Sequence, residues 1–320
     1  MHRLVQLHQR PAQRIAWPDR KRFAFTIFDD PDSQTLAVGR SVYAFLEDLG
    51  FRTTKAVWPI RGNGTPSDHG ETCAEPEYRA WAQSLQARGF EIAYHNATGH
   101  TSTRSETCRA LDTFFEYFGT YPSAMANHYN CDEAIYWGDA RLSGIYRLCY
   151  NLLTRGKNRN RSAGHREDHP YFWGDLCRRH IRYVRNFVFA DINTLAACPY
   201  MPYHDPRRPY VNAWFAASEG NNCDVFVDRI DEAHQDRLEE EQGACIMYVH
   251  LAHGFVDNGR LNPRFVALMK RLSRKDGWFV PASTILDYLS VQDRRGAVDN
   301  AQRRSLERRW LWHKVRFGTA

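Results

Sequence analysis

Three groups of side chains in this 320-residue sequence have types and spacings that suit chemistry. Asp29 and Asp30 are adjacent carboxylates, so one can bind a metal ion while the other faces a substrate. His95 and His100 are five residues apart, which would place them on different faces of a helix but lets both turn toward one point from a loop. Two imidazoles, one carboxylate and a water molecule make up a typical catalytic zinc site. His250 adds a titratable group that could act as an acid.

Each group also has a purely structural interpretation. The two aspartates could form a turn before Pro31, because Asp-Pro turns are common. His95 and His100 could be polar loop residues in a chain that has 14 histidines. His250 could be a hydrogen-bonded histidine beneath a loop, and His253 competes with it as the candidate acid.

Strand and helix patterns alternate along most of the chain and determine where these groups lie. Strands are predicted over 22–28, 53–59, 90–94, 123–127, 184–189, 211–216, 244–249 and 278–280, and helices over 36–49, 76–88, 104–118, 228–242, 263–277 and 281–289. Repeated strand–helix units favour a parallel sheet with helices outside it, either open or closed as a barrel. In such folds reactive groups lie just past the carboxyl ends of strands, and each of the three groups follows a predicted strand.

Composition narrows the class of protein. With 43% hydrophobic and 25% charged residues the chain is globular, and no apolar run approaches the ~18 residues of a spanning helix. The eight cysteines form no CxxC pair, which favours reduced thiols in the cytoplasm, and we expect no secretory signal. The net charge is +6, but residues 291–320 alone hold eight Lys or Arg and three acids. The rest of the chain is close to neutral, so no nucleic-acid partner is expected.

The C-terminal segment has two interpretations. Residues 301–317 carry Leu306, Trp310, Leu311, Val315 and Phe317 among basic residues, so they could form an amphipathic helix on an anionic bilayer. The alternative is a helix packed across the main domain or in a dimer contact. We therefore divide the chain into a domain over 1–290 and a basic amphipathic helix over 291–320.

The candidate groups also resemble the motifs of a known family, the polysaccharide deacetylases. The run Phe23–Asp32, followed by a helix and a strand, resembles the opening of that family, whose first motif is Thr-Phe-Asp-Asp. The run 89–104, with its two histidines, resembles the second motif, and Met247–His250 resembles the last. The run 277–281 resembles the usual ending, so the match covers roughly residues 20–290.

This resemblance implies a distorted (β/α) barrel of the polysaccharide deacetylase type with an added C-terminal helix. It also implies a role for each matching residue. Asp29 would be the general base, Asp30, His95 and His100 would be the metal ligands, and His250 would be the general acid. The implied ion is Zn²⁺ or another divalent metal ion, since ligand type alone does not decide among them.

The sequence departs from the family pattern at three places. The histidines are spaced H-x4-H where the family has H-x3-H. The run 126–130 stands where an Arg-x-Pro-Tyr motif is expected, so the arginine that orients the base is missing and Arg104 is the candidate substitute. The Trp-bearing fourth motif is not recognisable, although the run 171–175 could supply an aromatic wall.

Polar and aromatic residues near these motifs are candidates for substrate binding. The set is Asn127, His128, Trp173, Asp175, Tyr203 and Trp214. A polar loop over 154–169 carries five Lys or Arg residues and could clamp a phosphate, or could simply be a solvated surface loop.

These observations together predict a metal-dependent enzyme that removes an N-acetyl group from a sugar in surface-polysaccharide or glycan-precursor assembly. Its expected location is the cytoplasm, with peripheral contact at the inner membrane surface through the C-terminal helix as one option. Three alternatives remain open: a hydrolase of another amide or ester on the same scaffold, a non-catalytic carbohydrate-binding relative, and a peripheral membrane scaffold.

Overall fold

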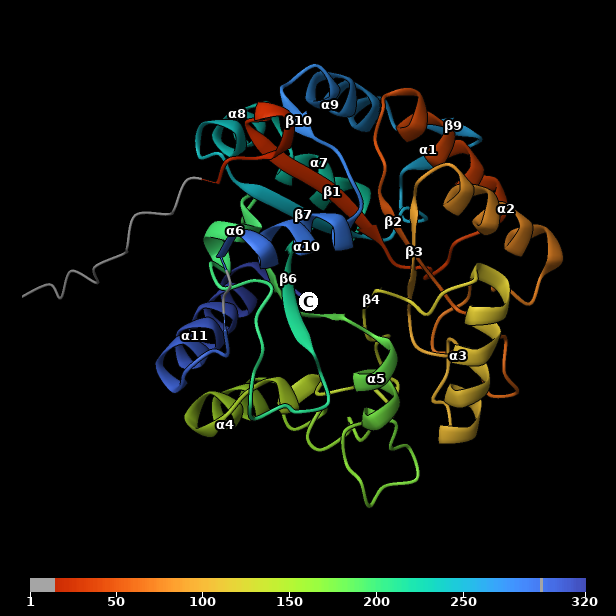
Figure 1. Ribbon diagram of the computed structural model, residues 1–320, viewed down its shortest axis with the longest axis vertical. Helices are drawn as coiled ribbons and strands as arrows, with labels where there is room; N and C mark the ends of the chain where they lie inside the picture. Colours follow the sequence, from red (N-terminus) through yellow and green to blue (C-terminus); the bar gives the residue numbers. More distant parts are fainter. Residues whose placement is uncertain (1–14, 294–295) are drawn as a thin grey trace, which may run out of the picture.

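Seven parallel strands close into a barrel in the computed structural model, which describes residues 15–293 and 296–320 (Figure 1). The strands are β1 (Phe23–Asp29), β2 (Thr54–Val57), β3 (Glu91–Tyr94), β4 (Ala124–Met125), β5 (Tyr183–Phe189), β6 (Ala213–Glu219) and β7 (Ala244–Val249). They pair in chain order, and β7 returns to β1 with a register that runs from Ala24 opposite Ala244 to Asp29 opposite Val249. A short strand, β10 (Gly277–Trp278), adds to the other side of β1. The predicted (β/α) barrel is confirmed.

Helices surround the barrel and follow the sequence pattern closely in the first half of the chain. They are α1 (Leu36–Asp48), α2 (Pro76–Ala87), α3 (Arg104–Phe118), α4 (Gly144–Leu153), α5 (Gly174–His180), α6 (Thr194–Ala197), α7 (Cys223–Arg229), α8 (Glu232–Glu240), α9 (Pro263–Ser273), α10 (Ala282–Asp293) and α11 (Asn300–Phe317). Two 3-10 turns, η1 (Pro18–Arg20) and η2 (Gly138–Arg141), and the hairpin β8 (Val256–Asp257) with β9 (Arg260–Leu261) complete the described elements.

Local signals explain where several helices begin. The Thr103 side chain accepts a hydrogen bond from the Glu106 backbone and Glu106 bonds back to Thr103, a capping box that starts α3 where it was predicted. Asn262 caps α9 and Pro263 occupies its first turn. The predicted helix over 228–242 is in fact divided between the end of α7 and the shorter α8, with Asp231 as the cap of α8.

The strands are buried on both sides, as expected when helices cover the outside of a parallel barrel. All seven residues of β1 and all six of β7 are buried. The long connection between β4 and β5 carries η2, α4 and α5, and it forms much of the wall of the cavity described below.

The C-terminal helix packs across the barrel, as the second interpretation of this segment expects. In α11 the side chains of Leu306 and Trp310 are buried, and Trp310 stacks against Tyr150 of α4 and Phe187 of β5. Figure 1 shows α11 beside α4 on the outside of the barrel. In the described part of the chain no helix is both long and apolar enough to cross a membrane.

Candidate active site

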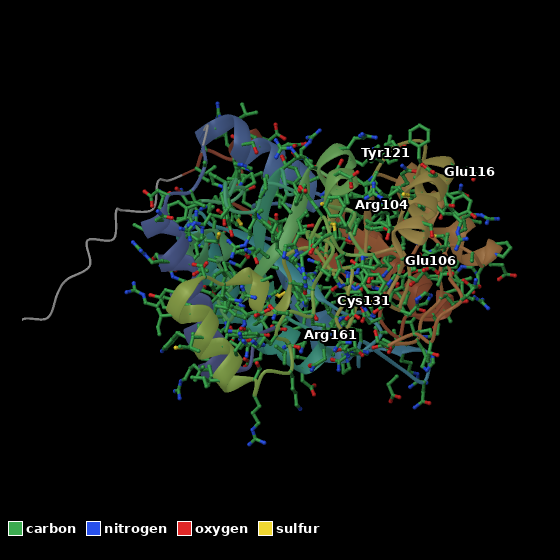
Figure 2. The ribbon with its side chains drawn as sticks, turned by 90° about the horizontal axis from the view of Figure 1, so that it is seen from below. Arg104, Glu106, Glu116, Tyr121, Cys131 and Arg161 are labelled. Atoms are coloured by element: carbon green, nitrogen blue, oxygen red, sulfur yellow. The ribbon has the colours of Figure 1, made fainter. Side chains whose placement is uncertain are left out.

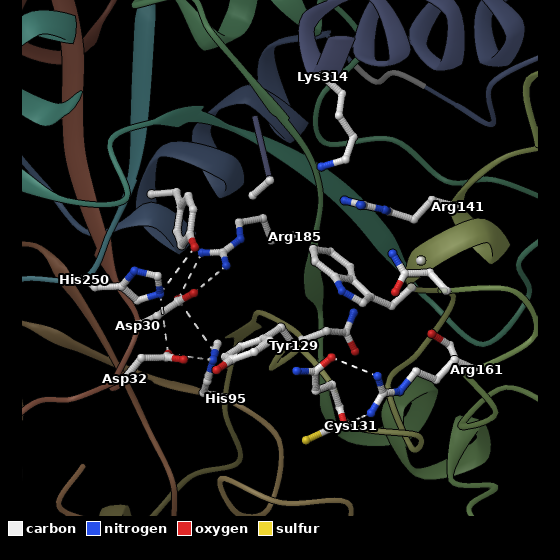
Figure 3. A pocket seen from close by; sticks show the side chains of 18 of the residues that line it. Asp30, Asp32, His95, Tyr129, Cys131, Arg141, Arg161, Arg185, His250 and Lys314 are labelled. Carbon is white, nitrogen blue, oxygen red and sulfur yellow. Dashed lines mark hydrogen bonds and ion pairs between the residues drawn. The ribbon is translucent and has the colours of Figure 1, made fainter. Parts of the chain in front are cut away.

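A cavity of about 330 Å³ lies at the carboxyl ends of the barrel strands (Figure 3). Residues that follow β1, β3 and β7 line one side of it, namely Asp30, Asp32, His95 and His250. The connection between β4 and β5 supplies much of the other side, including Arg141 and Arg161. The rule that polar groups collect past strand ends therefore holds for this barrel.

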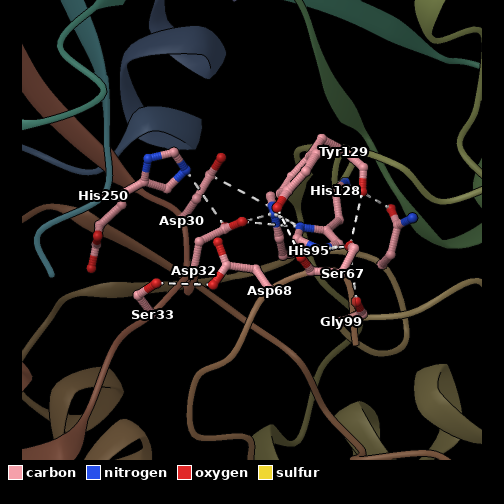
Figure 4. A network of polar contacts seen from close by, with 12 residues as sticks. Asp30, Asp32, Ser33, Ser67, Asp68, His95, Gly99, His128, Tyr129 and His250 are labelled. Atoms are coloured by element: carbon pink, nitrogen blue, oxygen red, sulfur yellow. Dashed lines mark hydrogen bonds and ion pairs between the residues drawn. The ribbon is translucent and has the colours of Figure 1, made fainter. Parts of the chain in front are cut away.

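Asp32, His95 and His128 form a compact, buried group of metal-ligand type (Figure 4). The Asp32 carboxylate lies 3.3 Å from His95 Nε2 and 3.2 Å from His128 Nδ1. The two imidazoles face each other, with His95 Nε2 3.2 Å from His128 Nδ1. One carboxylate oxygen and two imidazole nitrogens thus point toward a common centre.

The barrel order explains how these residues meet. His95 directly follows β3 and His128 lies three residues past β4, and these strands are neighbours that pair Tyr94 with Met125. Asp32 lies beyond the end of β1. It lies in the turn that follows Pro31, and both Asp30 and Asp32 line the cavity.

The protonation states in this group suit a cation. Ser67 Oγ donates to the Gly99 carbonyl, so at 2.9 Å from His128 Nε2 it accepts the imidazole proton and leaves Nδ1 with a lone pair toward Asp32. Burial outweighs the neighbouring carboxylates and lowers the pKa of His95, which favours a neutral ring. Burial alone would raise the pKa of Asp32, but the adjacent His128 and His95 bring it well below its usual value.

Two buried atoms of this group have no hydrogen-bond partner among the described residues, Asp32 Oδ2 and His95 Nδ1. Buried polar atoms normally find a partner, and a bound ion is one of the common explanations when no side chain or backbone group supplies one. Imidazole nitrogen together with carboxylate oxygen is a ligand set that zinc and related divalent ions accept. The residues present therefore fit a divalent metal ion.

Asp30 is held by an arginine rather than by the histidines. Arg185, in β5, donates from Nη1 to Asp30 Oδ1 at 3.0 Å and from Nη2 to Asp30 Oδ2 at 2.5 Å. Both side chains are buried, and the guanidinium also lies over the Tyr248 ring at 4.2 Å. Burial alone would lower the pKa of Arg185, but the charge of Asp30 raises it, so the guanidinium stays charged. This two-point contact fixes the orientation of the Asp30 carboxylate.

His250 lies at the same cavity with one nitrogen free to face it. Its Nδ1 donates to the Asn221 carbonyl at 2.9 Å, which leaves Nε2 toward the cavity, 3.6 Å from Asp32 Oδ2 and 3.3 Å from the Tyr248 hydroxyl. Asp30, Asp32 and His250 offer ligand-type atoms that all lie within 4.8 Å of one another. The side chain is 14% exposed, so it is accessible from the cavity.

Asp29, the expected general base, does not line the cavity. Its Oδ2 lies 2.9 Å from Lys55 Nζ and accepts hydrogen bonds from Gln34 and Tyr43, and its Oδ1 accepts from the Leu251 backbone. Burial and the charge of Asp29 raise the pKa of Tyr43 well above its usual value, so the phenol keeps its proton and donates. The carboxylate is fully enclosed, and the structure assigns it a place in the framework behind the cavity.

His100, one of the expected metal ligands, is not brought to the Asp32 group. Its Nδ1 donates to the Thr101 carbonyl at 2.8 Å and its Nε2 accepts from the Gly64 backbone at 3.0 Å. Both ring nitrogens are used, so neither offers a lone pair to an ion. The second imidazole of the group comes instead from His128, which follows the next strand of the barrel.

Arg104, the expected partner of the base, lies on the outside of the barrel. Figure 2 shows it on α3 with Glu106 and Glu116. It forms a two-point ion pair with Asp175 of α5 at 2.7 Å, so Asp175 is also outside the cavity. The arginine that contacts a carboxylate of the cavity is Arg185, which binds Asp30.

The remaining candidates for substrate binding lie in three different places: the cavity lining, the metal-ligand group and the core. Asn127 lines the cavity and is braced by hydrogen bonds to both backbone groups of Ile135. His128 belongs to the metal-ligand group. Trp173, Tyr203 and Trp214 are buried in the core and are not among the residues that line the cavity.

Two residues of the site, Asp32 and Arg185, were not among the candidates from the sequence, and His128 was expected to bind substrate rather than a metal ion. Asp32 lies two residues after Asp30, in the run that follows the predicted strand over 22–28. His128 follows the predicted strand over 123–127, so the rule that selected His95 would also have selected it. Arg185 is an isolated charge inside a buried strand, and such charges are almost always paired.

Comparison with solved structures supports the fold. Two proteins described as candidate polysaccharide deacetylases match it. The one from Mycobacterium smegmatis has a TM-score of 0.52 and 14% identity, over 91% of this chain and 98% of that one. The one from Pseudomonas aeruginosa PAO1 has a TM-score of 0.50 and 11% identity, over 87% of this chain and 94% of that one. PuuE allantoinase matches with a TM-score of 0.50 and 12% identity, over 87% of this chain and 93% of that one. No protein-family model and no curated protein sequence matches. The chain thus has the polysaccharide deacetylase fold, as its sequence motifs predicted.

Proposed function

We propose that this protein is a metal-dependent hydrolase that removes an N-acetyl group from a sugar in surface-polysaccharide or glycan-precursor assembly. The observation that carries the proposal is the convergence of Asp32, His95 and His128 beside the arginine-held Asp30 and the edge of His250 that faces the cavity. The deacetylase fold supports the same reaction class. The scattered spacing of the eight cysteines along the chain supports the cytoplasm as the working location.

The metal centre in this proposal is formed by Asp32, His95 and His128, which differs from the set expected from the motifs in two of three positions. Asp30 is not one of the proposed ligands, because Arg185 already neutralises its charge with two hydrogen bonds. The bound ion, Zn²⁺ or another divalent metal, would polarise the amide carbonyl and lower the pKa of an attacking water.

Asp30 is the proposed general base. It takes a proton from the attacking water, and Arg185 keeps its carboxylate aimed at the cavity during that transfer. His250 is the proposed general acid. With Nδ1–H held by the Asn221 carbonyl, its protonated Nε2 faces the cavity and donates a proton to the departing amine. The products are acetate and the free amino sugar.

A pair of histidine variants tests the metal centre. His128→Ala removes a proposed ligand, whereas His100→Ala removes the ligand expected from motif spacing and serves as the matched control. Bound metal is measured by mass spectrometry after gel filtration of zinc-loaded protein, and acetate release is measured on a panel of N-acetylated sugars. We expect His128→Ala to lose both metal and turnover and His100→Ala to keep the metal. Full metal content in His128→Ala would refute the assigned centre.

A further inference from the structure

We propose that the side of the cavity opposite the metal centre binds an anionic group, phosphate or carboxylate, carried by the acetylated sugar, with Arg141 and Lys314 as its counter-charges. This inference rests on the proposed function and specifies its substrate class. Figure 3 shows Asp30, Asp32, His95 and His250 on one side of the cavity and Arg141, Arg161 and Lys314 on the other.

Arg141 is a buried cation without a counter-charge. Its side chain is nine-tenths or more buried, with a residue exposure of 3%, and its guanidinium lies between the rings of Trp137, at 3.9 Å, and Trp310, at 4.2 Å. Nη1 donates to the neutral Asn186 carbonyl at 3.3 Å, and Nε has no hydrogen-bond partner. Within the described residues no carboxylate forms an ion pair with it. Burial lowers the pKa of Arg141 to about 10, which reflects the cost of enclosing this charge.

Lys314 brings a second cation to the same wall. It projects from α11 into the cavity lining, and its Nζ donates to the Thr319 carbonyl at 2.6 Å, again a neutral partner. Burial and the nearby charge of Arg141 lower the pKa of Lys314 to about 8. In the described part of the chain it too forms no ion pair with a carboxylate.

The other charged side chains considered in the cavity lining are already matched. Asp30 is paired with Arg185, and Asp32 lies among the histidines of the metal-ligand group. Arg161 lies 3.1 Å from the Asp132 carboxylate. The excess positive charge is therefore concentrated at Arg141 and Lys314. An enclosed charge without a partner is costly, and an anionic ligand group would offset that cost.

The size of the cavity agrees with one substrate that reaches both sides. About 330 Å³ is within the range of small-molecule sites and suits a monosaccharide with one substituent. An acetamido group at the metal centre would then place a phosphate or carboxylate of the same molecule at the cationic wall. The competing explanation is that Arg141 serves only to pack Trp137 against Trp310, and that explanation predicts no anion binding.

The test measures anion binding without turnover. Inorganic phosphate in one arm and glucuronate in a second arm are titrated into the full-length, metal-loaded protein by calorimetry. The test variant is Lys314→Met, which keeps a long side chain over Trp310, and the matched control is Arg308→Met, an exposed cation of the same helix. We expect Lys314→Met to weaken binding about 10-fold or more and Arg308→Met to change it less than about 2-fold, because charge-assisted hydrogen bonds are the strong ones.

The two arms and a second variant make the outcome decisive. The tighter of the two probes identifies the anionic group as phosphate or carboxylate. Arg141→Met should show the same loss, and its thermal melting curve reports whether it folds. Equal affinity in the wild type and Lys314→Met, or no binding of either probe, overturns the anion site. Binding that depends on Lys314 in a protein that releases no acetate supports the anion site and refutes the proposed function, so the two failures are distinguishable.

Discussion

Double variants that remove Asp29 or Asp30 together with its cation should have opposite effects on turnover. Both are fully or almost fully buried, Asp29 against Lys55 at 2.9 Å and Asp30 against Arg185 at 2.5 Å. Removing one partner of a buried ion pair leaves an uncompensated charge and costs about 3–5 kcal/mol. Asp29→Asn and Asp30→Asn should therefore each lower the free energy of unfolding by about this amount.

The contacts of Asp29 and Lys55 also predict which single variant of this pair loses more stability. Lys55→Met leaves Asp29 with three hydrogen-bond donors, from Gln34, Tyr43 and Leu251, so its cost should fall at the lower end of the range. Asp29→Asn leaves the buried Lys55 ammonium without a carboxylate, with neutral acceptors such as the Asp30 carbonyl at 3.4 Å, so its cost should fall at the upper end. The double variant Asp29→Asn/Lys55→Met removes both charges and should recover most of the lost stability.

Turnover separates the two pairs. Asp29 and Lys55 do not line the cavity, so the stabilised double variant Asp29→Asn/Lys55→Met should keep wild-type turnover within a few-fold. Asp30→Asn/Arg185→Met should also regain stability but lose about 10²–10⁴-fold in turnover, the usual contribution of a general base. Urea unfolding gives the stabilities, and acetate release from the best N-acetylated sugar of a panel gives the rates. A stable, metal-loaded Asp29→Asn/Lys55→Met protein without turnover would show that Asp29 takes part in the chemistry, and an active Asp30→Asn/Arg185→Met protein would exclude Asp30 as the base.

Three further predictions concern residues around the site. Ser67→Ala removes the group that fixes the proton of His128 on Nε2, so metal affinity in a chelator competition should fall about 10–100-fold; an unchanged affinity would show that the hydroxyl does not orient the ligand. Burial raises the pKa of Glu133 from 4.5 to about 7, so its contribution to stability is complete below pH 4.5 and is lost as the pH rises through 7. The difference in unfolding free energy between wild type and Glu133→Gln, measured by urea at pH 5 and pH 8, should therefore shift by about 2.5 kcal/mol, and a constant difference would contradict this. Thr103→Ala removes the capping box of α3 and should cost about 1 kcal/mol in the same assay, with unchanged metal content as the sign that only the helix end is affected.

Much of the fold could be predicted because its signals are local. The strand over 244–249 and the helix over 104–118 match β7 and α3 residue for residue, since an unbroken apolar run and a capped helical period identify such elements within one window. The region from about 130 to 240 gives weaker signals, above all before β5, where the short elements η2, α4 and α5 are separated by long loops with no clear period. That region supplies most of the cationic wall, including Arg141.

The sequence by itself determined that polar, ligand-type residues follow the strands of a parallel barrel, because local periodicity and strand ends can be recognised along the chain. Which of these residues meet was decided only by the tertiary structure. A shift of one residue along an extended strand turns a side chain to the opposite face, and this separates Asp29, held by Lys55, from Asp30 at the cavity. The partner of Asp30 is Arg185, 155 residues away, and barrel closure alone brings the two strands within reach. Motif spacing between His95 and His100 carried no such information, because a spacing along the chain does not specify which neighbouring strand supplies the second imidazole.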